Sequence, residues 1–161
     1  MAKNQTLKIT EMDRYLFGQG THYEIYKLMG AHPTKQKGKD GVYFAVWAPR
    51  AQEVAVVGDF NGWDPNENIM KCDNDMGIYQ LFIPGVKSGD LYKFCITSPS
   101  GELLYKADPY ANYAEKRPGN ASRVYDITNF KWNDSVWMKN RQNYDVNKNA
   151  MSIYEVHPGS W

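Results

Sequence analysis

Apolar and polar side chains alternate along the middle of the chain with a period of two. Residues 42–47 follow this pattern, and residues 53–57 form a second, β-branched run before a turn at Gly58-Asp59. Such runs predict strands with one face toward a core. Further strands are predicted at residues 78–83, 91–97, 102–105 and 122–127. About six or seven short strands separated by Gly, Pro, Asn and Asp predict an all-β, immunoglobulin-like antiparallel sandwich.

The N-terminal residues have helical spacing instead. Thr21 and Glu24 have the spacing of a capping box, ahead of a run that predicts a short amphipathic helix over residues 23–29. Thr10 and Asp13 repeat this spacing before a glycine and predict a second, shorter helical turn. The sandwich is therefore preceded by a short helical segment.

The segments outside the strands have distinct compositions. Residues 35–40 are polar and rich in lysine, which predicts an exposed loop. Residues 128–150 lack a clear period and predict a connector, whereas residues 151–156 are again strand-like. We expect four parts, namely a helical segment at 1–37, a sandwich at 38–127, a connector at 128–150 and the start of another domain at 151–161.

Composition and charge narrow the possible partners. The 161 residues include 19 Lys and Arg against 18 Asp and Glu, a formal net charge of +1. This balance argues against nucleic acid or an anionic membrane surface as a partner. No signal peptide and no run of about 20 apolar residues is present. We therefore expect a cytoplasmic protein.

The metal-ligating residue types are scattered. Cys72 and Cys95 are too far apart for a metal knuckle and too few for a disulfide framework, so free thiols are expected. His22, His32 and His157 have no ligand spacing. We predict neither a metal site nor a cofactor.

The aspartates do not form a candidate catalytic pair. A retaining glycosidase needs two carboxyl groups about 5 Å apart. Each nearby aspartate lies beside Asn, Gly or Pro, where aspartate is an ordinary turn former, namely Asp59, Asp64, Asp73 and Asp75. No catalytic residue is therefore predicted in this chain.

Four stretches together resemble the amino-terminal region of 1,4-α-glucan branching enzymes. They are YLFGQG with YKLMGAHP, VWAP with VGDFNGW, YKF with KADPYA, and IYEVHPGSW. Within them, residues 38–127 resemble a carbohydrate-binding module of family 48. The Phe-Asn-Gly-Trp element alone indicates only that module, whereas the first and last stretches favour the branching enzyme.

The resemblance implies a parent protein of glycoside hydrolase family 13. Its (β/α)₈ barrel would cleave an α-1,4 bond and transfer the chain to a 6-hydroxyl, and residues 151–161 would begin that barrel. Such a barrel needs about 250 residues, so the catalytic carboxylates would lie outside this chain. The implied partners are α-1,4-glucan, such as glycogen or maltooligosaccharides, and the barrel itself.

Trp63 and Lys93 are the leading candidates for sugar contact. The C–H-rich face of a glucose ring packs on an aromatic plane, and Trp63 lies in a turn signature. A tryptophan closing the end of the sandwich is an equal alternative for it. Lys93 alternates with Tyr92 and Phe94, so it points away from the core if those two face inward. A solvated strand lysine is its alternative, and the resemblance favours glucan contact for both.

Tyr105 and Asn120 are weaker candidates. Related modules carry a second tryptophan in the next hairpin, where this chain has Tyr105 as its nearest aromatic residue. This departure predicts weak binding or a mainly structural role. Asn120 lies in the loop where related modules hydrogen-bond to the sugar, and an ordinary turn is its alternative. Trp132 and Trp137 of the connector form either a second sugar surface or, as we favour, a contact with the barrel.

Three functions remain open. The chain is a glucan-positioning module of a branching enzyme, a glucan-binding regulatory subunit, or an immunoglobulin-like spacer that binds no sugar. The first is our prediction, because the resemblance extends through almost the whole chain.

Overall fold

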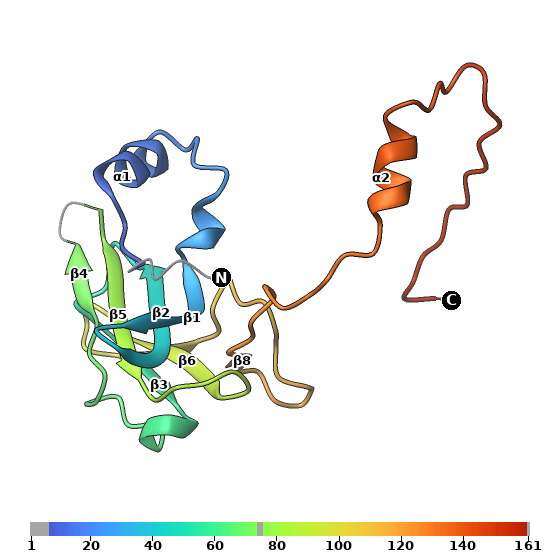
Figure 1. The fold of residues 1–161 in the computed structure, drawn as a ribbon. Helices are drawn as coiled ribbons and strands as arrows, with labels where there is room; N and C mark the ends of the chain where they lie inside the picture. Colours follow the sequence, from blue (N-terminus) through green and yellow to red (C-terminus); the bar gives the residue numbers. More distant parts are fainter. Residues whose placement is uncertain (1–6, 74–75, 161) are drawn as a thin grey trace. The chain divides into compact units, whose positions relative to one another are not determined.

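Two antiparallel sheets pack face to face in the computed structural model, which describes residues 7–73 and 76–160 (Figure 1). The first sheet has the order β1-β2-β5-β4, and the second has the order β3-β6-β7, with β8 also paired to β6. The strands are β1 (Gly30–Gln36), β2 (Lys39–Trp47), β3 (Glu53–Gly58), β4 (Lys71–Asp73), β5 (Ile78–Pro84), β6 (Leu91–Thr97), β7 (Leu103–Lys106) and β8 (Ser122–Arg123). The helices are α1 (Glu11–Gly18), α2 (Ser135–Arg141) and the 3₁₀ turns η1 (Ile25–Lys27) and η2 (Asp59–Asn61).

The core lies between the sheets and is built by the alternation seen in the sequence. Every second residue of β2, β3 and β6 points inward and is almost fully buried, namely Val42, Phe44, Val46, Val54, Val56, Tyr92 and Phe94. The ring centroids of Phe44 and Tyr92 lie 5.1 Å apart with an edge-on geometry that aromatic pairs favour. The predicted immunoglobulin-like sandwich is confirmed, as are the strands at 42–47, 53–57, 78–83, 91–97 and 102–105.

The predicted loop at residues 35–40 is wrong. Strand β1 pairs with β2 from Gly30 opposite Ala45 to Gln36 opposite Lys39, and a two-residue turn with positive φ at Lys37 and Gly38 joins them. The sequence pattern did not predict β1, because β1 is an edge strand. An edge strand can hold a proline and polar side chains without losing its ladder.

The predicted helix at residues 23–29 is also wrong. Only the 3₁₀ turn η1 forms there, without a side-chain cap, before the chain enters β1. The other capping box is present. Thr10 accepts a hydrogen bond from the Asp13 N–H, the Asp13 carboxylate accepts one from the Thr10 N–H, and α1 begins after Thr10. Two further differences are β4, which was not predicted, and β8, which spans two residues of the predicted 122–127.

The N-terminal segment covers the outer face of the first sheet. Ile9 and Met29 are buried there against the outward side chains Tyr43, Ala45 and Ile78. The Arg14 guanidinium of α1 forms an ion pair with Asp73 of β4, with an N–O distance of 2.6 Å. This segment therefore gives the first sheet a buried outer face.

A buried carboxylate attaches the loop after β7 to the core. The Tyr92 hydroxyl donates to Asp108 Oδ2 over 2.5 Å, and the Tyr110 N–H donates to Asp108 Oδ1 over 2.8 Å. The Asp108 N–H in turn donates to Ser122 Oγ over 2.8 Å. Burial raises the pKa of the Tyr92 hydroxyl, so it remains a donor. These hydrogen bonds give a structural role to Asp108, the aspartate of the KADPYA stretch.

Residues 129–160 form a separate unit from the sandwich. In this unit Phe130 and Trp132 make an edge contact, and the Arg141 guanidinium lies 5.3 Å from the Trp137 ring centroid on α2. The run at residues 151–156 forms no strand in this part of the described chain, and Ile153 and Tyr154 are exposed. Its assignment to a barrel remains a prediction.

Residues 1–6, 74–75 and 161 lie outside the described residues. The structure therefore tests the predictions for residues 1–37 and 151–161 only in part, and the prediction for Asp75 lies outside the described residues. No helix of the described chain is both long and apolar enough to cross a membrane.

The buried Asp108 predicts a pH dependence of stability. Burial raises the pKa of this carboxyl, although the hydrogen bonds from Tyr92 and Tyr110 oppose the rise. With a folded pKa above the unfolded one, the folded protein binds more protons, so stability is lost as pH rises through the raised pKa. The Asp108→Asn variant has no carboxyl at this position, so it does not lose this stability as pH rises. The free energy of unfolding of Asp108→Asn minus that of wild type should therefore increase from about pH 4 to about pH 7.

Urea unfolding at a series of pH values measures this difference. Asp40→Asn is the control, because its side chain is 87% exposed. A relative stability of Asp108→Asn that is constant with pH, or that falls as pH rises, would contradict the prediction.

Candidate functional site

The outer face of the second sheet gathers the predicted site residues. Because Tyr92 and Phe94 face the core, Lys93 and Cys95 of β6 point to the opposite side. Strand register places Cys95 opposite Tyr105 of β7. Lys93, Cys95 and Tyr105 therefore share one face of the sheet.

Strand β3 supplies the apolar part of this face. Ala55 lies opposite Cys95 and Val57 lies opposite Lys93. Ala55, Val57 and Cys95 form a small buried cluster, and the Trp63 side chain packs against it. The face thus has an apolar centre of small side chains on which a large ring can lie.

The turn after β3 determines where Trp63 lies. The Gly58 N–H donates to Asn61 Oδ1, and Asn61 Nδ2 donates to the Val56 carbonyl, both over 2.9 Å. Gly62 then adopts a left-handed conformation with φ of 61°, and the Trp63 N–H donates back to the Gly58 carbonyl. The chain reverses at this point, so the indole returns over the end of β3.

The position of Trp63 combines the two alternatives of the sequence analysis. The residue is half-buried, and it contacts the outer side of the sheet rather than the core between the sheets. Trp63 itself has φ of 65°, a left-handed conformation that costs about 1 kcal/mol for a residue with a side chain. Tight turns and ligand-binding segments are where such conformations concentrate.

Lys93 and Asn120 are joined by a hydrogen bond. Lys93 Nζ donates to Asn120 Oδ1 over 2.5 Å, so the loop before β8 lies beside β6 on this face. Asn120 is exposed, whereas Ser122 two residues later is buried with Asp108. The amide nitrogen of Asn120 and two protons of the ammonium group remain available to a ligand.

Tyr105 completes the face from β7. The side chain is 47% exposed, and the strand register places it opposite Cys95. Burial raises the pKa of Cys95, so the thiol stays neutral beneath Trp63 and Tyr105. Sequence reasoning did not select Cys95, although its spacing of two from Lys93 placed it on the same side.

The face therefore carries two aromatic rings, an ammonium and an amide around an apolar centre. Rings of this kind pack on the flat face of a pyranose, and the polar groups suit its hydroxyls. The nearby aspartates serve the fold, since Asp59 accepts the Leu91 N–H and Asp64 accepts the Asn66 N–H. Within residues 7–73 and 76–160, no group of three or more His, Cys, Asp or Glu side chains could hold a metal ion. Cys72 and Cys95 are free thiols.

Comparison with known proteins gives a family and several relatives. Residues 28–111 match the model of Carbohydrate-binding module 48 (Isoamylase N-terminal domain). The chain is 59% identical over 158 residues to 1,4-alpha-glucan branching enzyme GlgB of Butyrivibrio fibrisolvens, covering 98% of this chain and 25% of that protein. It is 53% identical over 152 residues to GlgB of Halothermothrix orenii, covering 94% and 24%. The chain thus spans about a quarter of the length of these curated relatives.

A solved structure supports the fold. A protein described as an alpha amylase from Salmonella typhimurium superposes with a TM-score of 0.50 at 26% sequence identity, over 68% of this chain and 16% of that one. The sandwich is therefore an arrangement shared with that protein.

The turn that orients Trp63 can be tested through Asn61. Asn61→Ala removes the hydrogen bonds of the Asn61 side chain to Gly58 and Val56, and a longer one of 3.5 Å to the Asp64 carbonyl, so the Val56 carbonyl and the Gly58 N–H lose this partner. We expect the free energy of unfolding to fall by about 1–3 kcal/mol. The indole N–H resonance of Trp63 should shift in the same variant, because the ring loses its fixed position.

Urea unfolding and NMR spectra measure the two effects. Asn112→Ala is the control, because this asparagine is exposed. Unchanged stability together with an unchanged Trp63 resonance in Asn61→Ala would show that Asn61 does not hold the turn.

Proposed function

We propose that this chain, which belongs to the carbohydrate-binding module 48 family, holds α-1,4-glucan on the outer face of its second sheet. The observation that carries the proposal is the convergence of Trp63, Tyr105, Lys93 and Asn120 on that face. These four residues come from four separate parts of the sequence. Trp63 packs against Cys95, Tyr105 lies opposite Cys95 in the strand register, and Lys93 is hydrogen-bonded to Asn120.

The chemistry of the face suits a neutral sugar polymer. Trp63 is half-buried and rests on Ala55, Val57 and Cys95, so it can offer a ring surface without losing its support. Among the described residues, the indole N–H of Trp63 has no hydrogen-bond partner, so it can donate to a sugar hydroxyl. The near-neutral charge of the chain is also better suited to glucan than to nucleic acid or an anionic membrane, and a cytoplasmic location remains our prediction.

We further propose that the chain serves as the glucan-positioning part of a 1,4-α-glucan branching enzyme. The support is the identity of 46–59% with proteins of that name over at least 94% of this chain. The remaining three quarters of those relatives would supply the barrel and its carboxylates. Binding of glucan next to that barrel would raise the local concentration of donor chains.

The experiment is a titration of the chain with maltoheptaose, followed by amide and indole NMR shifts. We expect shifts at Trp63, Lys93 and Tyr105, and a dissociation constant of about 1 mM or weaker, because the face has one indole and one phenol. Trp63→Ala should reduce the affinity at least about tenfold, since it removes the larger ring.

Trp137→Ala is the matched control, because this tryptophan belongs to the other unit. If Trp137→Ala removes binding and Trp63→Ala does not, the sugar surface lies on the connector instead. If maltoheptaose shifts no resonance, the spacer alternative replaces the proposal.

Lys93 gives a second test with a different readout. Lys93→Met keeps the length of the side chain but removes its hydrogen bonds to Asn120 and to sugar hydroxyls. We expect a loss of about threefold to tenfold in maltoheptaose affinity, with thermal stability almost unchanged, since the pair is exposed. Lys106→Met, on the exposed edge of β7, is the control. Equal affinities of Lys93→Met and wild type would remove Lys93 from the site.

A further inference from the structure

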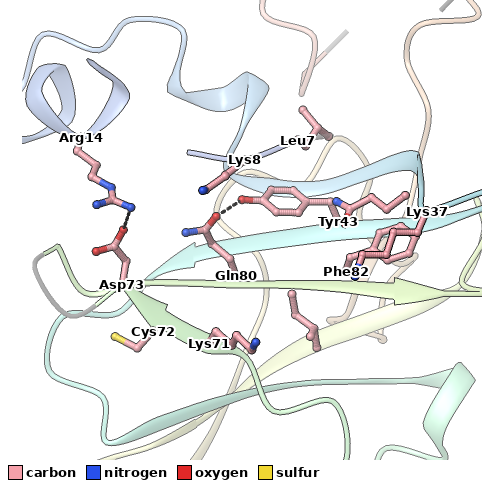
Figure 2. A pocket seen from close by; sticks show the side chains of 12 residues that line it. Leu7, Lys8, Arg14, Lys37, Tyr43, Lys71, Cys72, Asp73, Gln80 and Phe82 are labelled. Atoms are coloured by element: carbon pink, nitrogen blue, oxygen red, sulfur yellow. Dashed lines mark hydrogen bonds and ion pairs between the residues drawn. The ribbon is translucent and has the colours of Figure 1, made fainter. Parts of the chain in front are cut away.

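A cavity of about 870 Å³ lies on the other side of the sandwich, on the outer face of the first sheet. The part of the N-terminal segment that the structure describes, from residue 7 on, leaves some of this face uncovered, and the cavity opens between that part, the β1–β2 turn and β4 (Figure 2). Its volume is within the range of about 300–1,000 Å³ typical of small-molecule sites. No residue of the Trp63 face lines it.

Positive charge dominates the described lining of the cavity. Lys8 comes from the N-terminal segment, Lys37 from the β1–β2 turn and Lys71 from β4. None of the three has an ion pair or a side-chain hydrogen bond within the described residues. The one carboxylate of the described lining, Asp73, is already paired with Arg14. Three lysines with no ion pair among the described residues therefore line one concave space, which raises the local concentration of anions.

The polar groups of the cavity floor are donors as well. The Tyr43 hydroxyl donates to Gln80 Oε1 over 2.6 Å, and Figure 2 shows these two side chains pointing toward one another. Burial raises the pKa of Tyr43, so the hydroxyl keeps its proton and the Gln80 oxygen stays occupied. The Gln80 amide nitrogen is then left to donate into the cavity.

Arg14 adds an unsatisfied donor at one end. Its terminal nitrogen forms an ion pair with Asp73, whose side chain is 7% exposed. Two buried atoms of this pair, Arg14 Nε and Asp73 Oδ2, have no hydrogen-bond partner among the described residues. A buried polar atom without a partner is costly, and here one donor and one acceptor are left at the same end of the cavity. The three lysines and Gln80 thus add donors to the cavity, and its side-chain acceptors in the described lining are Asp73 Oδ2 and the Gln36 amide oxygen.

This donor excess distinguishes between ligand classes. A neutral sugar presents both donors and acceptors, so its hydroxyl protons would find few acceptors here. A phosphate monoester presents acceptor oxygens and negative charge, which match lysine and arginine donors. A bare phosphate would fill only a small part of the volume, and the remaining wall contains the half-buried ring of Phe82 and the Gln80 amide.

We propose that this cavity binds a sugar monophosphate, with its phosphate on Lys8, Lys37 and Lys71 and its ring against Phe82. The site is separate from the proposed glucan face, because the two lie on the outer faces of different sheets. It would allow a small phosphorylated metabolite and a glucan polymer to bind the same module. If one of the two proposed ligands does not bind, the binding of the other can still be tested.

The test is an NMR titration of the chain with glucose 6-phosphate, inorganic phosphate and glucose at constant ionic strength. We expect glucose 6-phosphate to shift the backbone amides of Lys71, Gln80 and Phe82. Inorganic phosphate should shift the same amides with lower affinity, and glucose should leave them unchanged. Equal shifts with glucose and glucose 6-phosphate, or no shift at these amides, would overturn the proposal.

A double variant tests the lysines. Lys8→Gln with Lys71→Gln should lower the affinity for glucose 6-phosphate about tenfold for each charge removed, because each is a charge-assisted hydrogen bond. The thermal midpoint should not change, since both side chains are exposed. Lys87→Gln, an exposed lysine outside the lining, is the matched control for net charge. Retained affinity in the double variant, or an equal loss in Lys87→Gln, would overturn the assignment.

Discussion

The alternation along β6 is the constraint on which the rest of the arrangement depends. Tyr92 and Phe94 are fully buried, and a slip of one residue in the ladder would place Lys93 in the core and both rings in solvent. The Tyr92 hydroxyl also reaches Asp108, so the same strand orders the loop that leads toward β8. Burial on one side of β6 therefore fixes what its other side presents. That other side consists of Lys93 and Cys95, and neither is required by the core.

The turn after β3 adds the element that the strands cannot supply. A side chain on a strand stands roughly perpendicular to the sheet. Trp63 instead returns from a left-handed turn onto Ala55 and Val57, whose small side chains leave room for an indole. The local conformational cost at Trp63 is offset by the hydrogen bonds of Asn61. A half-buried ring with a fixed orientation is the result.

Much of this could be predicted from the sequence, and the failures have physical causes. Period two identified the strands that bury one face, and the same period placed Lys93 outward. Strand β1 was not predicted because, among the described strands, it pairs with β2 alone, along one edge. Polar residues and Pro33 therefore cost little stability in this strand. The capping-box spacing was present twice, but only the Thr10 box is formed, because the second segment makes just the 3₁₀ turn η1, without a side-chain cap, before the chain enters β1 at Gly30. The degree of burial of Trp63 depends on residues 55, 57 and 95 together, and no local pattern contains all three.

The two outer faces of the sandwich differ in charge and in aromatic content, because different segments of the chain pack on them. The first sheet receives the N-terminal segment, whose Arg14 and Lys8 bring positive charge over a face that already has Lys71 at its edge. Within the described part of the sandwich, the second sheet receives the Trp63 turn and the Asn120 loop, which bring one ring and one amide. An excess of donors favours a ligand that carries negative charge and acceptors, whereas rings on small apolar side chains favour a ligand with flat C–H surfaces and no charge. Because each covering is contributed by a different part of the chain, the chemistry of either face can be altered without disturbing the core between them.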